Sequence, residues 1–392
     1  MAPAVRHDAM RAGNLAVVLG ELDRHGPLTR AALAENTGLT KTTVSKLVGD
    51  LIEAGMAVES GAVRDGERGR PGVAVRLSGH RVAALGLEIN VDYLAACVVD
   101  LSRSVRVLRT QAVDNRAASP QDVITRLGDL GTAMLGEAAA LGLAVAGCVV
   151  ALPGPVDRLT GSVHRAPNLG WKDVAVTGAL ALPVPMLVDN EANLAALGEL
   201  WFGSGAALGD FLHVSGEIGI GAGLVVDGAL FRGAHGFAGE LGHVVVSPDG
   251  PACRCGGTGC LERYAGQDAL VPPGQGINDL VRRLQAGDPA AAKACARAGA
   301  ALGVALTTAV NLVDPDTIVL GGIFAPLFPW VSGPAAEAMR ARLGQMRAHV
   351  PTLAVSRVGG DAATLGAAGQ VIQRVIADPG AYLDLAAGDT LG

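Results

Sequence analysis

The sequence predicts an α/β protein with an N-terminal winged helix-turn-helix followed by two α/β lobes. Two observations predict this architecture. Helical apolar stripes separated by glycine turns precede a short β-hairpin, and an order of strands, helix and strand then occurs twice. The chain has 392 residues, enough for two or three domains. We expect residues 1–80 to form the first domain and residues 81–392 the second.

Three helices open the chain. The first carries an apolar face at helical spacing, formed by Leu15, Val18, Leu19 and Leu22. It should end near Gly26-Pro27, and Thr29 is placed to cap a second helix that Gly38 ends. Thr40 can cap the third, whose apolar stripe is Val44, Leu47, Val48, Leu51 and Ile52. Helix, glycine turn, helix is the helix-turn-helix pattern.

The third helix turns four polar side chains away from its stripe: Lys41, Thr42, Ser45 and Lys46. A predicted hairpin of strands 56–60 and 73–77 follows, with three further cations at its tip, Arg64, Arg68 and Arg70. Short polar groups and cations suit major-groove edges and phosphates, and a basic wing tip suits the minor groove. We predict that these seven residues contact double-stranded DNA. A three-helix interaction module with solvated charges is the alternative.

Composition and charge restrict the function. Half of the residues are apolar, which excludes a mainly disordered chain, and 12 aromatics in 392 residues disfavour a stacking platform for single strands. Residues 1–80 carry a net charge of +1 and the remainder −7, which suggests two modules with different partners. The six cysteines show no spaced disulfide framework, and we expect a cytoplasmic protein without secretion signal or membrane span.

The second module should contain two lobes of related architecture with a ligand cleft between them. Lobe one is expected over about 81–200 plus the C-terminal helix, and lobe two over about 201–364. The expected elements of lobe one are strands 83–88, 93–100 and 105–111, helix 120–141 and strand 144–152. Those of lobe two are strands 211–215 and 222–226, a long helix after Asp288-Pro289, and strand 317–320.

One group of metal-ligand residues stands out: His243, Cys253, Cys255 and Cys260. One imidazole and three thiols form a set that closes a tetrahedral zinc site. Because no coordination position would remain open, the zinc would be structural, which argues against a zinc-dependent hydrolase. A reduced thiol cluster without metal is the alternative.

The run Gly-Glu-Leu-Gly-His at 239–243, followed by Cys-Arg-Cys-Gly-Gly-Thr-Gly-Cys-Leu-Glu at 253–262, resembles the signature of the ROK family of repressors and sugar kinases. The resemblance covers nearly the whole chain. It implies an actin-like, ribonuclease H-like fold of two lobes. The preceding winged helix is similar to the family's repressor branch, which includes regulators of the xylose-repressor and N-acetylglucosamine-repressor type.

The resemblance also implies a sugar site. Family members hold sugar hydroxyls with groups whose matching positions here are Gly154, Asn190, Glu191, Glu240, His243 and Glu262. His243 would then serve zinc with one ring nitrogen and the sugar with the other. Carboxylates and an amide in a cleft also suit a neutral polyhydroxylated ligand on chemical grounds.

The departures from the family's kinases concern phosphate handling. Kinases carry Asp-x-Gly-x-Thr early in the first lobe, where this chain has Glu88-Ile89-Asn90-Val91-Asp92. The family's catalytic Asp is replaced by Glu191, and a one-methylene shift of a carboxylate can cost ~10²-fold in rate. The glycine-rich turn 216–221 contains Glu217, which would repel an anion. That turn is also explained as a tight connection between strands.

We therefore expect a sugar-responsive DNA-binding transcriptional regulator, a repressor, with no catalytic residue. A dimer is expected because one helix-turn-helix reads half of a symmetric operator, so the assembly would be a homodimer or homotetramer. The effector would be a small sugar or sugar derivative. The alternative is an active ATP-dependent sugar kinase that carries a DNA-binding head.

Overall fold

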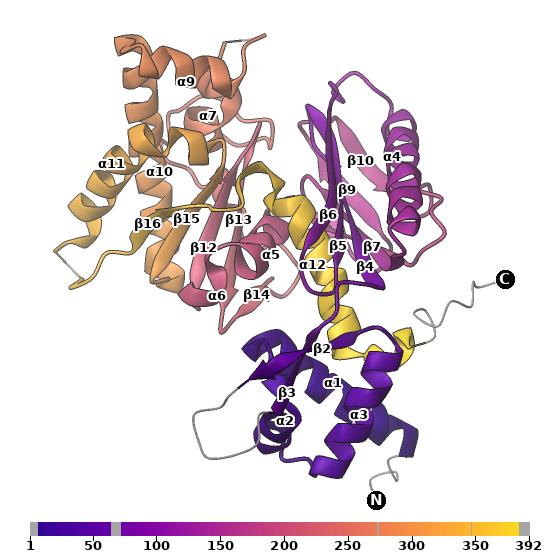
Figure 1. The fold of residues 1–392 in the computed structure, drawn as a ribbon. Coiled ribbons are helices and arrows are strands. Elements are labelled where there is room, and N and C mark those ends of the chain that lie inside the picture. The colour runs from indigo at the N-terminus through magenta and orange to yellow at the C-terminus, as the bar shows by residue number, and fades with distance from the viewer. Residues whose placement is uncertain (1–6, 64–71, 273, 346, 384–392) are drawn as a thin grey trace, which may run out of the picture.

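The computed structural model describes residues 7–63, 72–272, 274–345 and 347–383, and it has a head and two lobes (Figure 1). The predicted α/β class and the winged head are confirmed. The three basic candidates at the wing tip, Arg64, Arg68 and Arg70, lie outside the described residues.

The head contains the predicted helices and hairpin. Its elements are α1 (His7–His25), β1 (Leu28–Thr29), α2 (Arg30–Thr37), α3 (Lys41–Glu53), β2 (Ala57–Val63) and β3 (Gly72–Leu77). Thr29 Oγ1 accepts a hydrogen bond from Ala32 N, and Thr40 Oγ1 accepts one from Thr43 N. These caps satisfy free N–H groups at the starts of α2 and α3. The antiparallel sheet has the order β1-β3-β2, as a winged helix requires.

Lobe one is built on the sheet β11-β7-β4-β5-β6. Its main elements are β4 (Val82–Ile89), β5 (Tyr93–Asp100), β6 (Val105–Ala112), α4 (Pro120–Ala140), β7 (Ala144–Leu152) and β11 (Met186–Asn190). A second, three-stranded sheet contains β8 (Val156–Asp157), β9 (Ser162–Ala166) and β10 (Trp171–Ala175). β4 and β5 are almost wholly buried, which agrees with their continuous apolar sequence.

Lobe two is built on the sheet β14-β13-β12-β15-β16. Its strands are β12 (Phe211–Gly216), β13 (Ile220–Val226), β14 (Ala229–Phe231), β15 (Thr317–Gly322) and β16 (Thr352–Val355). Its helices are α7 (Glu262–Ala265), α8 (Gln267–Leu270), α9 (Ile277–Gln285), α10 (Pro289–Val313) and α11 (Phe324–Leu343), with the 3₁₀ turns η1 (Leu241–His243) and η2 (Gly359–Asp361).

The two large sheets share one topology. In each, the first three strands form an antiparallel meander. The fourth strand pairs in parallel with the first, and the fifth pairs in parallel with the fourth. The expected pair of related lobes is therefore present. The repeat could be detected from the sequence because a long helix lies between the third and fourth strands of each sheet, α4 in lobe one and α10 in lobe two.

Two helices run between the lobes, α5 (Glu191–Phe202) and α12 (Ala362–Ala377), with α6 (Gly205–Leu208) after the first. They cross at backbone contact: a Cβ on Gly198 would lie 2.0 Å from the Ala362 carbonyl oxygen, and one on Gly366 1.8 Å from that of Leu194. α5 packs on α12 and on the sheet of lobe two, and α12 continues to the head and ends in η3 (Pro379–Tyr382) (Figure 1). The boundaries of the domains and lobes stay predictions.

In the part of the chain that the structure describes, α10 alone is long and apolar enough to cross a membrane. Its residues Cys295, Leu302 and Leu306 are buried in the core of lobe two, where the helix packs against α11. α10 thus has the packing of a core helix.

Candidate effector cleft and metal cluster

The four predicted metal ligands come together. The ligand atoms of His243, Cys253, Cys255 and Cys260 all lie within 4.8 Å of one another. The Cys255 and Cys260 Sγ atoms are 3.7 Å apart, and Cys253 Sγ is 4.0 Å from His243 Nδ1. Three thiols and one imidazole form a donor set that fits zinc, so the cluster can hold a metal ion.

Glycines allow the chain to wrap around this cluster. Gly256 and Gly259 have φ of +97° and +70°, and a Cβ on Gly259 would lie 1.6 Å from the Ser247 carbonyl oxygen. Cys253 N donates to the Gly257 carbonyl, and Gly256 N donates to that of Cys253. Only glycine fits such a tight turn without strain, so the loop positions its thiols through its backbone.

His243 connects the cluster to the cleft beside it. Its Nδ1 faces the Cys253 thiol, whereas its Nε2 lies 3.9 Å from Glu240 Oε2. Both residues belong to the turn around η1, whose backbone is held by His243 N donating to the Glu240 carbonyl. The two ring nitrogens therefore point to different sites, and an ion on one side would fix the ring orientation on the other.

All six residues predicted to bind sugar line one cleft between the lobes. They are Gly154, Asn190, Glu191, Glu240, His243 and Glu262. Lobe one supplies the first two from the ends of β7 and β11. Lobe two supplies the last three from residues 240–262, the metal loop, which carries the four ligands of the cluster. A ligand in the cleft would contact both lobes. The role of each residue stays a prediction.

Asn190 is fixed before any ligand arrives. As N-cap of α5, its Oδ1 accepts from Ala192 N at 3.0 Å and Asn193 N at 3.1 Å, and its Nδ2 donates to the Gly154 carbonyl at 3.0 Å. Gly154 has φ of +81°, and a Cβ there would lie 2.3 Å from the Arg165 carbonyl oxygen. The loop from β7 is thus tied to the start of α5.

The cleft also contains polar groups that our sequence reasoning missed: Asn168, Asn193 and Arg254. Asn193 Oδ1 is buried and has no hydrogen-bond partner among the described residues, so it is an acceptor available to a hydroxyl. Arg254 Nη1 donates to Asn168 Oδ1 at 3.0 Å across the lobes. The sequence did offer one signal for Arg254: it lies between Cys253 and Cys255, so a metal cluster beside the cleft would bring it close to the cleft as well.

Glu191 and Glu240 in the cleft have raised pKa values. Burial raises the pKa of Glu191 to about 8, with further contributions from Glu88, Glu240 and Glu262. Burial also raises the pKa of Glu240, against a lowering effect of His243. Near neutral pH, Glu191 is thus mainly a neutral carboxylic acid that can both donate and accept.

The turn 88–92 matches, by the family resemblance, the first phosphate turn of the kinases, and its side chains bond to neighbouring residues of this chain. Glu88 is buried; its Oε1 accepts from Tyr93 Oη at 2.7 Å and its Oε2 from Thr364 Oγ1 at 2.5 Å. Asn90 donates to Tyr93 Oη and accepts from Val91 N. Glu88, Tyr93, Glu191 and Glu217 share a small cavity. Burial, with Glu88 and Glu191 nearby, raises the pKa of Glu217 well above its ordinary value.

On the head, α3 presents the predicted polar face. Lys41, Thr42, Ser45 and Lys46 are exposed, whereas the apolar stripe of the helix is buried except for the half-buried Ile52. Thr42 and Lys46 border a groove that α1 closes from the other side with Arg11 and Asn14. The four side chains are free to meet a ligand, and their contact with DNA stays a prediction.

The fold and the cleft define a class: a winged helix joined to a sugar-kinase-like pair of actin-like lobes. The chain belongs to the ROK family, whose profile matches residues 84–374, and the MarR family profile matches residues 16–68. The xylose repressor of Bacillus subtilis (strain 168) is 28% identical over 373 residues, covering 93% of this chain and 96% of that protein.

Two solved structures extend the likeness. A ROK family transcriptional regulator, a homolog of the Escherichia coli Mlc protein, has a TM-score of 0.78 at 25% identity and covers 97% of this chain and 100% of its own. A ROK family glucokinase from Streptomyces griseus, in complex with glucose and AMPPNP, has a TM-score of 0.63 at 27% identity and covers 74% of this chain and 98% of its own. The chain is thus similar to a regulator over nearly its whole length.

Proposed function

We propose that this chain is a sugar-responsive, DNA-binding transcriptional regulator, a repressor, whose sugar-kinase-like domain does not transfer phosphate. The observation that carries the proposal is the combination, in one chain, of an exposed polar face on α3 and an interlobe cleft lined by carboxyl, amide and imidazole groups. The similarity to a named xylose repressor over 93% of the chain supports it. In this proposal the partners are operator DNA and a neutral sugar. As a DNA-binding regulator, the protein would act in the cytoplasm.

A structural zinc ion belongs to this proposal. His243, Cys253, Cys255 and Cys260 would hold it, and its charge would keep the thiols deprotonated. The ion would fix the loop that carries His243 and leads to Glu262. All four ligands come from the chain, so zinc takes no direct part in binding the sugar.

Loss of phosphoryl transfer is supported by the occupied first turn. A phosphate there would meet Glu88, already bonded to Tyr93 and Thr364, and then the carboxyl groups of Glu191 and Glu217. Since phosphoryl transfer depends mainly on positioning and charge stabilisation, a cavity lined by three carboxyl groups and by no cationic side chain of the described residues disfavours the kinase alternative.

Regulation would follow from lobe closure in a homodimer or homotetramer. A sugar contacts both lobes, so it favours the closed arrangement by its differential affinity for the two states. In a symmetric dimer, closure changes the relative placement of two heads that each read one half-site.

The test begins with selection of an operator from random duplexes, followed by fluorescence anisotropy with D-xylose, D-glucose and N-acetyl-D-glucosamine. We expect at least one sugar to change the operator Kd by about fivefold or more. Glu240→Ala should abolish that change while leaving sugar-free DNA binding nearly intact. Absence of specific DNA binding, or of a response to all three sugars, would contradict the proposal.

The predicted DNA face has its own control. Lys46→Ala should weaken operator binding and lower the slope of log K against log salt by about one, because one phosphate contact is lost. Lys172→Ala removes an exposed lysine from β10 of lobe one and should leave the slope unchanged. Equal slopes for Lys46→Ala and the unchanged protein would place this face away from DNA.

A further inference from the structure

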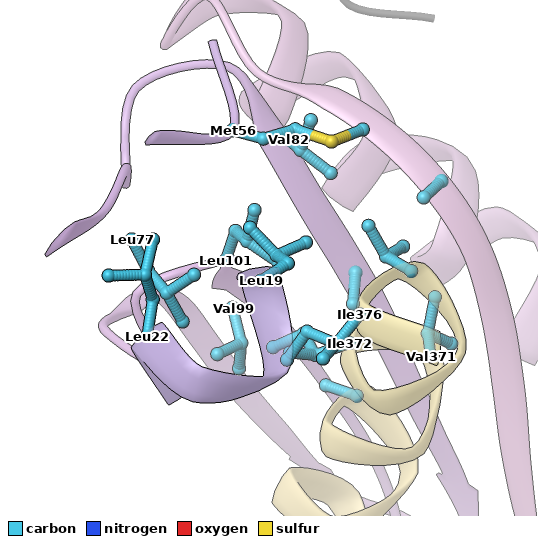
Figure 2. Packing of buried hydrophobic residues seen from close by; sticks show 14 of the residues in the cluster. Leu19, Leu22, Met56, Leu77, Val82, Val99, Leu101, Val371, Ile372 and Ile376 are labelled. Carbon is cyan, nitrogen blue, oxygen red and sulfur yellow. The ribbon is translucent and has the colours of Figure 1, made fainter. Parts of the chain in front are cut away.

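The head is not connected to the lobes by a linker alone; it shares their hydrophobic core. Leu19 and Leu22 of α1 pack in one cluster with Leu101 after β5 and with Ile372 and Ile376 of α12 (Figure 2). The same cluster contains Met56 and Leu77 of the head and Val82 of lobe one. The position of the head is therefore tied to α12, which also packs on α5 between the lobes.

A polar contact secures this interface. Arg103, in the turn between β5 and β6, donates to both carboxylate oxygens of Asp23 on α1, from Nη2 at 2.9 and 3.0 Å and from Nε at 3.2 Å. Gln373 Nε2 of α12 donates to Asp23 Oδ2 at 3.1 Å. Side-chain exposures of 18% for Arg103 and 13% for Asp23 place the pair partly out of water, where such a bidentate bond is strong and directional.

The guanidinium also lies over the end of α5. Its central carbon is 5.7 Å from the ring centre of Trp201 and 6.0 Å from that of Phe202. Arg103 Nη1 is buried with no hydrogen-bond partner among the described residues, as expected for a guanidinium held in part by aromatic rings. Arg103 has φ of +65° in a turn braced by Arg106, which donates to Asp100 and to the Gly79 carbonyl.

The opposite end of α5 is in the effector cleft. Asn190 caps the helix and Glu191 begins it, and both line the cleft. At 1.5 Å per residue, the 12 residues of α5 span about 18 Å from the cleft to Trp201 and Phe202. Since α5 and α12 touch at Gly198 and Gly366, a shift of one would carry the other with it.

We propose that Arg103 is the positioning residue through which the effector cleft sets the head: a displacement of α5 is passed from Trp201 and Phe202 to Arg103 and then to Asp23 on α1. This proposal rests on the proposed function and specifies its regulation. It requires that the contact differ between the sugar-bound and sugar-free states, because only a differential contact transmits free energy.

The experiment measures coupling, defined as the ratio of operator Kd with saturating sugar to that without it. The sugars are D-xylose, D-glucose and N-acetyl-D-glucosamine. We expect Arg103→Gln, Asp23→Asn and Trp201→Leu each to reduce the ratio by about fivefold or more, up to complete loss. Sugar affinity and sugar-free operator affinity should stay within about threefold. Arg109→Gln is the matched control and should keep the ratio, because it breaks an exposed ion pair between β6 of the same sheet and Glu137 of α4.

A double-variant cycle separates transmission from loss of stability. The pair Asp23→Asn with Arg103→Gln should uncouple no more than either single variant, and the exchanged pair Asp23→Arg with Arg103→Asp should regain part of the ratio. Thermal unfolding is measured for each variant, and the assay is run well below its midpoint. Single variants that retain the full ratio would overturn this proposal alone. An unchanged protein that shows no sugar-dependent DNA binding would overturn it together with the proposed function.

Discussion

Glu191 illustrates how the environment of a single carboxyl group sets its chemistry. It begins α5, at the position that the family resemblance assigns to the catalytic Asp of the kinases, and the charges of Glu88, Glu240 and Glu262 act on it. Its pKa is raised from 4.5 to about 8, first by burial and then by those charges. A group that stays protonated near neutral pH is poorly suited to accept a proton from a sugar hydroxyl. It is well suited to hold that hydroxyl by donating and accepting at once.

This pKa predicts a pH-dependent stability. Between about pH 4.5 and pH 8 the folded chain keeps a proton on Glu191 that the unfolded chain releases, so the free energy of unfolding falls as pH rises. Glu191→Gln removes this linkage, and we expect the variant to gain about 3 kcal/mol over the unchanged protein between pH 5 and pH 8. Chemical unfolding across that range measures the difference.

Glu337→Gln provides the control, because Glu337 is an exposed carboxyl on α11. Its stability difference from the unchanged protein should not vary with pH. A difference for Glu191→Gln that stays constant from pH 5 to pH 8 would show that Glu191 titrates below this range.

At the scale of elements, local signals in the sequence were sufficient for most of the fold. Thr29 and Thr40 cap the helices that their positions predict, and β5 and β7 have the predicted bounds. The metal cluster was also predictable, because all four ligands lie within 18 residues of chain. Such patterns are predictive because residues close together in the sequence determine the local helix, strand or ligand geometry.

Contacts between distant segments were not predictable. The Asp23–Arg103 pair joins residues 80 positions apart, and Thr364 bonds to Glu88 across 276 positions. Nothing in the spacing of such residues marks them as neighbours, since they meet only after the lobes and α12 have packed. For the same reason, the sequence indicated only that Tyr93 begins a strand. It did not indicate that the Tyr93 hydroxyl donates a hydrogen bond to Glu88 in the turn 88–92.

The metal loop yields a prediction at this scale. The chain should contain about one zinc ion, and Cys255→Ser should lose both the metal and the sugar response. Cys255 is exposed, so the substitution itself disturbs little packing. The loop that contains His243 and leads to Glu262 should then lose its fixed geometry, and the midpoint of thermal unfolding should fall by several degrees. Elemental analysis and sugar-dependent thermal shifts measure these effects.

Cys295→Ala serves as the control for the thiol chemistry, because Cys295 is a buried cysteine of α10 outside the cluster. It should keep both the zinc and the sugar response. Cleanly purified protein without zinc would contradict the metal assignment, whereas a sugar response that survives Cys255→Ser would separate the cleft from the cluster.

At the scale of the whole molecule, the two lobes have one topology but contribute different contacts to the cleft and to the head. Lobe two supplies the metal loop and three of the predicted sugar contacts. Lobe one supplies Asn190 and, through the turn after β5, a direct contact to the head. A ligand that brings the lobes together therefore acts on the part of the molecule on which the head is packed.

The same two-lobe arrangement is what a kinase uses to enclose ATP, so catalytic competence is tested on the entire chain. We expect the purified protein to bind a sugar and yet to form ADP only at background rate. Glu191→Asp, which restores the shorter carboxylate of family kinases, should remain at background as well. The reason is that the base is only one of the lost parts: Tyr93 and Thr364 donate hydrogen bonds to Glu88, and Glu217 places a buried carboxyl side chain, not an anion-binding group, in the glycine-rich turn 216–221. A coupled ADP assay with each sugar, read against Glu191→Ala, measures this directly. Sugar phosphate accumulating well above that variant would mean that the phosphate turns still function and that the kinase alternative is correct.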